Sequence, residues 1–206
     1  MSILSGCFLI GLMSYKSFRV PTKIMYLYVV LTFVTETLGY YSLYISAEKK
    51  VNFLLYNIYA PLSFSILSIF FYKIIENENI KKILFILTPL AVLISIYFVF
   101  GSSNSKLNYR ILLFSMVILS MYCIIFFKQT LNTEENFFSN PHFWIVTGIL
   151  FFYAGFFFLS GFINYISSKD IILARKLHTI NHLLNIVYYS LVTFGFICQR
   201  RLMKLS

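Results

Sequence analysis

The sequence has little charge. Of its 206 residues, 12% are Asp, Glu, Lys or Arg, whereas 59% are hydrophobic. A soluble domain carries about 25% charged residues, so this chain has too few of them to cover a surface that faces water. That shortage excludes a soluble enzyme and a disordered chain. The remaining class is a helical protein that crosses a membrane several times.

Cysteine and acidic residues are also scarce. The three cysteines, Cys7, Cys123 and Cys198, show no CxxC spacing, which argues against a disulfide framework or a zinc site. The chain has 17 Lys and Arg but only 7 Asp and Glu. The basic residues form short clusters between apolar runs, as expected where loops meet lipid headgroups. The predicted partner is therefore the lipid bilayer, and no nucleic acid is expected.

Long apolar runs make up most of the chain. A helix needs about 20 residues to cross a hydrocarbon core ~30 Å thick, and seven runs approach this length. They lie at about 2–15 (reaching 2–20 if Lys16 and Arg19 extend toward the headgroups), 24–46, 53–72, 83–101, 111–127, 143–166 and 178–198. The linkers between them leave no room for a soluble domain. We therefore predict an all-α, polytopic transmembrane bundle in which residues 1–206 form a single seven-helix domain.

The distribution of positive charge predicts an orientation. The linkers after the first, third and fifth runs, together with the C-terminal tail, hold ten Lys and Arg, and the other three linkers hold seven. Lys16, Arg19 and Lys23 follow the first run, and no basic residue precedes it. By the positive-inside rule these features predict an outer N-terminus and an inner C-terminus. The frequent Phe, Tyr, Ile, Asn and Lys suggest a bacterial source, and hence a bacterial cytoplasmic (inner) membrane.

One acidic residue lies deep in a predicted span. Glu36 is near the middle of the run 24–46. A charged carboxylate at this depth costs about 2.5–3.5 kcal/mol on insertion scales. We therefore expect Glu36 to face the interior of the bundle and to be hydrogen-bonded. Tyr40 and Tyr44 follow at i+4 and i+8, on the same side of the helix.

Further polar residues lie in the half of the bundle nearer the linkers after the second, fourth and sixth runs. In the last run, His178, His182, Asn185 and Tyr189 follow a helical spacing, with Asn181 and Tyr188 beside them. We interpret the set as the lining of a polar outer-half cavity with Glu36 as its floor. The alternative is a hydrogen-bond network that only locks helix packing. The predicted ligand-binding residues are Glu36, Tyr40, Asn57, Asn164, Asn181, His182, Asn185 and Tyr188.

No catalytic residues and no cofactor are predicted. His178 and His182 have the i, i+4 spacing of a helical metal pair, but the intervening Thr-Ile-Asn lacks the Glu of a zincin motif. The leading hypothesis is a sensor that binds a small molecule or ion and signals through a partner protein. The alternatives are a small transporter or channel subunit, for which one Glu per chain forms a ring only in a homo-oligomer, and an intramembrane metal-dependent enzyme. A purely structural subunit is the fourth possibility.

Overall fold

The computed structural model describes the backbone of residues 2–44, 49–101, 109–131, 137–167 and 171–205. Within these ranges it describes side chains except at 49–50, 95, 98–101, 109–111, 161–167, 171–178 and 205. Every regular element in the described residues is helical, which confirms the all-α prediction. The elements are α1 (Ser2–Ser14), the 3₁₀ turn η1 (Tyr15–Ser17), α2 (Val20–Tyr44), α3 (Lys49–Ile74), α4 (Glu78–Gly101), α5 (Tyr109–Leu131), the 3₁₀ turn η2 (Phe137–Ser139), α6 (Pro141–Ser167) and α7 (Ile171–Leu205).

Five helices contain a segment long and apolar enough to cross a membrane. Among the described residues these segments are Val20–Tyr44, Val51–Ile74, Leu112–Leu131, Pro141–Ser160 and Thr179–Lys204. None of these segments corresponds to the first or the fourth predicted span. Helix α1 has 13 residues, which corresponds to roughly 20 Å of helix and falls short of a bilayer core. Seven helices are thus present in the described chain, but seven spans and their orientation stay predictions.

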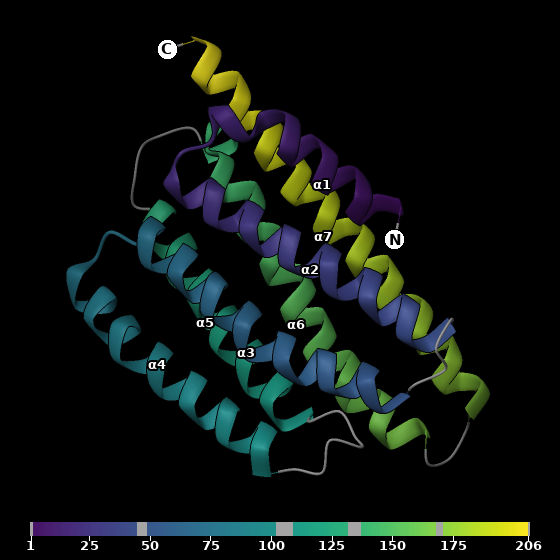
Figure 1. Ribbon diagram of the computed structural model, residues 1–206. Coiled ribbons are helices and arrows are strands. Elements are labelled where there is room, and N and C mark those ends of the chain that lie inside the picture. Colours follow the sequence, from purple (N-terminus) through teal and green to yellow (C-terminus); the bar gives the residue numbers. More distant parts are fainter. Residues whose placement is uncertain (1, 45–48, 102–108, 132–136, 168–170, 206) are drawn as a thin grey trace. The chain divides into compact units, whose positions relative to one another are not determined.

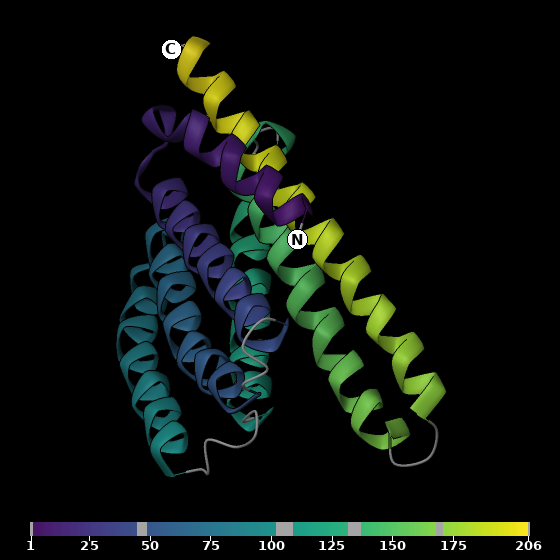
Figure 2. The ribbon, with the colours of Figure 1, turned by 45° about the vertical axis from the view of Figure 1, so that its right-hand side comes forward.

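The chain divides into two compact units, Met1–Ser115 and Met116–Ser206. In the first, consecutive helices pack against one another, α1 on α2, α2 on α3 and α3 on α4. In the second, α6 and α7 form a long helical hairpin, which both ribbon views show (Figures 1 and 2). The single seven-helix domain therefore stays a prediction.

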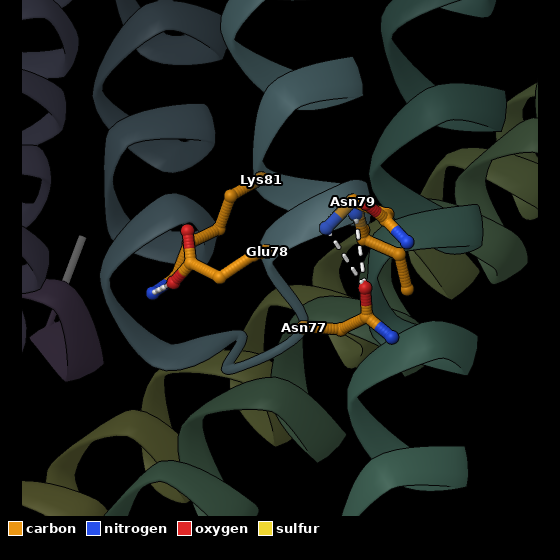
Figure 3. Close-up of polar contacts among 5 residues, drawn as sticks. Asn77, Glu78, Asn79 and Lys81 are labelled. Atoms are coloured by element: carbon orange, nitrogen blue, oxygen red, sulfur yellow. Dashed lines mark hydrogen bonds and ion pairs between the residues drawn. The ribbon is translucent and has the colours of Figure 1, made fainter.

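Polar side chains fix two helix starts. The Asn77 side-chain oxygen accepts hydrogen bonds from the backbone N–H groups of Asn79 (3.0 Å) and Ile80 (3.2 Å), as Figure 3 shows. Beside this cap, Glu78 in the first turn of α4 forms a 2.8 Å ion pair with Lys81. This hydrogen-bonded contact raises the pKa of Lys81. An acidic residue is favourable here because the helix N-terminus carries partial positive charge.

Helix α6 begins in a similar way. The Asn140 side chain accepts a 2.9 Å hydrogen bond from the backbone N–H of His142. Pro141 occupies the first helical position, where the missing N–H of proline has no intrahelical partner to lose. Trp144, one turn into α6, donates through its ring N–H to the carbonyl of Phe138 at 2.9 Å. These contacts explain why α6 begins two residues before the predicted span.

Glycine allows α6 and α7 to approach closely. A Cβ atom added to Gly195 of α7 would lie 2.6 Å from Cγ1 of Ile145 and 2.9 Å from the backbone carbonyl oxygen of Pro141. A Cβ atom on Gly148 of α6 would lie 3.2 Å from the Tyr188 carbonyl oxygen. Small residues at such positions let helix backbones pack closely within a membrane. The hairpin therefore depends on these glycines for its spacing.

We expect Gly195→Ala to destabilise the hairpin by about 1–3 kcal/mol, since the added methyl overlaps both a side chain and a fixed backbone carbonyl. The control is Gly6→Ala in α1, where nothing lies within 4 Å of the added Cβ atom. That change should be neutral or slightly stabilising, because Ala favours helix more than Gly. Thermal unfolding of both purified variants in the same detergent checks this. Equal melting temperatures for the two variants would contradict the proposed close approach.

Candidate functional site

The polar groups of the first unit gather where α2 packs on α3. We call this contact the α2–α3 polar seam, and its members lie on one face of each helix. They are Tyr28, Thr32, Glu36, Gly39 and Ser42 of α2 and Asn52, Tyr56 and Tyr59 of α3. The spacing on α3 is i, i+4, i+7, which places its three residues on one side of the helix.

Glu36 lies at the centre of this seam. Its side chain is half-buried and accepts a hydrogen bond from the hydroxyl of Tyr56 on the neighbouring helix. Tyr59, almost one turn further along α3, lies within electrostatic reach of the same carboxyl group. The expectation that Glu36 is hydrogen-bonded is therefore met, and the partner comes from α3.

A hydroxyl cluster occupies the seam on one side of Glu36. The Tyr59 hydroxyl lies 2.9 Å from Thr32 Oγ1 and 3.2 Å from the Tyr28 hydroxyl, and it hydrogen-bonds with both. Thr32 also donates a 2.9 Å hydrogen bond to the carbonyl oxygen of Tyr28. Each group in this cluster therefore has a partner within the seam, as low-dielectric surroundings require.

On the other side of Glu36, Gly39 leaves space between the two helices because it has no side chain. A Cβ atom on Gly39 would lie 3.1 Å from the Tyr56 hydroxyl and 3.2 Å from the side-chain oxygen of Asn52. Glycine thus makes room for these two polar groups against the α2 backbone. Beyond them, Ser42 Oγ lies 3.4 Å from the same Asn52 oxygen and donates to the Gly39 carbonyl at 3.0 Å.

The other predicted residues of the first unit lie off the seam. Tyr40 is 54% exposed and Tyr44 is 72% exposed, and their rings pack on each other with centroids 4.6 Å apart. Steps of four residues rotate about 40° around a helix, so these tyrosines turn away from the face that holds Glu36. Asn57 is buried, but it follows Tyr56 and so lies about 100° around α3 from the seam.

In the second unit, the described asparagine side chains of α7 hydrogen-bond within their own helix. The Asn185 side-chain amide donates to the Asn181 carbonyl at 2.9 Å and approaches its side-chain oxygen at 3.4 Å. His182 is exposed. Tyr188 is fully buried, with its ring stacked on Phe152 of α6 at 5.1 Å. The side chains of Asn164 and His178 lie outside the described residues.

The structure thus assigns partners to Glu36 but does not test the predicted cavity as a whole. Its proposed lining is divided between the two units, so the combined site stays a prediction. A metal centre gains no support within the described part of the chain, where no group of three or more His, Cys, Asp or Glu side chains lies together. In the described chain none of the three cysteines forms a disulfide; Cys7 and Cys123 are buried, and Cys198 donates to the Ser139 carbonyl at 3.3 Å.

The chemistry of the seam is that of oxygen ligands. A carboxyl group, a phenol and a carboxamide oxygen from Glu36, Tyr56 and Asn52 lie along one short stretch of two helices. Oxygen donors of this kind suit hard cations and protonated amines. A single carboxylate balances one positive charge, which favours a monovalent ligand in low-dielectric surroundings.

Comparison of the chain with known protein families, curated protein sequences and solved structures finds no match. The class of the protein therefore follows from the fold alone. An all-helical chain with five candidate spans among its described residues is consistent with a multi-pass membrane protein.

Gly39→Ala should disturb the seam selectively. The added methyl lies closest to the Tyr56 hydroxyl and would push it away from Glu36, so we expect a loss of about 1 kcal/mol in stability. Tyr56→Phe removes the nearest atom, and so Gly39→Ala should cost less in that background. Thermal unfolding of the two single variants and the double variant measures this coupling. Strictly additive effects would show that Gly39 and Tyr56 do not meet.

Proposed function

We propose that this protein is a multi-pass membrane protein that binds a small monovalent cation, inorganic or organic, at Glu36. In this proposal, binding is sensed by the α2–α3 pair and passed to a partner protein. The observation that carries the proposal is the half-buried Glu36 carboxyl, hydrogen-bonded to Tyr56 in the middle of an apolar helix. Ionisable groups are costly in a membrane, and those that occur there commonly serve ligand or ion binding.

The immediate surroundings of Glu36 support a cation rather than an anion. The groups that approach it offer oxygen atoms, from the Tyr56 phenol and, beside Gly39, from the Asn52 amide. Glu36 is the only acidic residue between Met1 and Tyr44, and Lys23, the basic residue of α2, lies more than three turns away along the helix. A single carboxylate therefore sets the charge of α2 at the seam. A ligand carrying one positive charge neutralises it without leaving excess charge in the seam.

Cation conduction is the second candidate. The observation that favours it is the hydroxyl cluster of Tyr59, Thr32 and Tyr28, which continues the polar groups of the seam away from Glu36. Chains of polar groups inside a membrane mark ion pathways in some transporters. Cation uptake by liposomes containing the protein distinguishes conduction, which gives time-dependent uptake, from binding, which gives none.

The binding test uses the purified chain in detergent at constant ionic strength. Replacing N-methyl-D-glucamine by Na⁺, K⁺ or methylammonium should raise the melting temperature, since a ligand of the native state stabilises it. Glu36→Gln should abolish the rise, and Tyr56→Phe should weaken the apparent affinity by roughly threefold to tenfold. The control Glu76→Gln removes an exposed acid between α3 and α4 and should leave the rise intact. A cation-dependent rise that persists in Glu36→Gln refutes the proposal.

We further propose that all seven helices cross the membrane, with the N-terminus outside and the C-terminus inside. Alkaline phosphatase fused between α4 and α5 should be active, because this connection would lie outside. Phosphatase fused at the connection between α3 and α4 should be inactive, and a C-terminal fluorescent protein should fluoresce. Equal phosphatase activity on both sides of α4 would show that this helix does not cross.

A further inference from the structure

The turn between α1 and α2 carries three positive charges within a short stretch. Lys16 lies in η1, Arg19 immediately precedes α2, and Lys23 lies in its first turns. All three side chains are exposed. In the described chain none of them forms an ion pair; the ion pair found there joins Lys81 and Glu78. No acidic residue occurs before Glu36 in the sequence, so the positive charge of this turn is not offset locally.

Aromatic rings hold the turn in a defined shape. The Tyr15 ring packs against Tyr26 at 5.5 Å and Phe18 at 6.3 Å, and Phe18 also contacts Tyr26 at 6.2 Å. The Lys23 ammonium lies 5.5 Å from the centre of the Tyr15 ring, a cation–π contact. The backbone closes the turn through a 3.1 Å hydrogen bond from Phe18 N–H to the Tyr15 carbonyl. These contacts within the chain define the shape of the turn without a ligand.

We propose that this basic turn, Tyr15–Lys23, binds the phosphate headgroup of an anionic phospholipid. Charge complementarity supports this occupant, since three cations lie at the end of a predicted membrane helix without an acidic partner. The aromatic cluster supports a membrane location, because tyrosine rings prefer the depth of lipid headgroups. Arg19 offers the paired N–H donors that fit phosphate oxygens, and the two lysines add positive charge around it.

The turn at the start of α4 provides a matched control. It also has three lysines, Lys73, Lys81 and Lys82, and its predicted side of the membrane is the same. There, however, acidic residues lie among the lysines, and Glu78 is paired with Lys81 (Figure 3). Replacing the three basic residues removes three positive charges from either turn, so a loss of simple charge attraction to anionic lipid would be similar in the two cases. Loss of a headgroup site would follow only from changes in the first turn.

Native mass spectrometry of the full chain, titrated with phosphatidylglycerol or phosphatidylcholine, tests the proposal. We expect preferential binding of phosphatidylglycerol. The triple variant Lys16→Gln, Arg19→Gln, Lys23→Gln should weaken it at least tenfold, and the control Lys73→Gln, Lys81→Gln, Lys82→Gln less than threefold. Arg19→Gln alone should weaken phosphatidylglycerol binding about threefold, and Arg19→Lys should weaken it less. These single variants keep most of the positive charge that sets the orientation of the protein, so they replace the triple variant if it fails to insert into the membrane.

Three results would overturn the proposal. Equal losses in the two triple variants would show non-specific attraction of basic residues to anionic lipid. Equal affinity for the two lipids would show that headgroup charge is not recognised. Competition by inorganic phosphate at the same concentration as the lipid would identify a free anion as the ligand.

Discussion

A carboxyl group in the middle of an apolar helix must find hydrogen-bond partners, and this constraint organises the first half of the molecule. Glu36 meets it through the Tyr56 hydroxyl on α3. The contact requires α2 and α3 to pack at a fixed register, and Gly39 provides the space for it. The paired hydroxyls of Thr32 and Tyr59 repeat the same arrangement nearly one turn away. Local sequence, helix packing and candidate function are thus linked at one interface.

In both units glycine allows two helices to pack closely, but the groups that it brings together differ. Gly195 lets α7 approach the apolar side chain of Ile145 and the backbone of α6. Gly39 instead admits two polar side chains of α3. Helix association in lipid lacks the hydrophobic driving force that acts in water, so close packing and interhelical hydrogen bonds must supply it. Gly195 thus allows close packing of α7 on α6, and Gly39 makes room for polar groups between α2 and α3.

Much of the secondary structure was predictable from the sequence, because a run of apolar residues between polar linkers has few alternatives to a helix in a membrane. Some helices extend beyond the apolar runs because capping residues such as Asn140 stabilise their first turn. A hydropathy pattern does not detect such caps. Glu36 was identified by depth alone. Its hydrogen-bond partner Tyr56 was not predicted. Helical periodicity relates Glu36 to Tyr40 on the same helix, but it does not indicate which residue of a neighbouring helix contacts Glu36. On α3 the prediction named Asn57 instead; the i, i+4, i+7 spacing of Asn52, Tyr56 and Tyr59 is the sequence signal that would have found the seam face of this helix.

The proposed cation site requires direct contact between the Glu36 carboxyl and the bound cation. Infrared difference spectroscopy of the reconstituted protein, recorded on exchange of N-methyl-D-glucamine for Na⁺, observes carboxyl groups directly. We expect a carboxyl band that shifts on exchange in the wild-type protein and that is absent from the difference spectrum of Glu36→Gln. An identical difference spectrum in the two proteins would contradict the proposed contact.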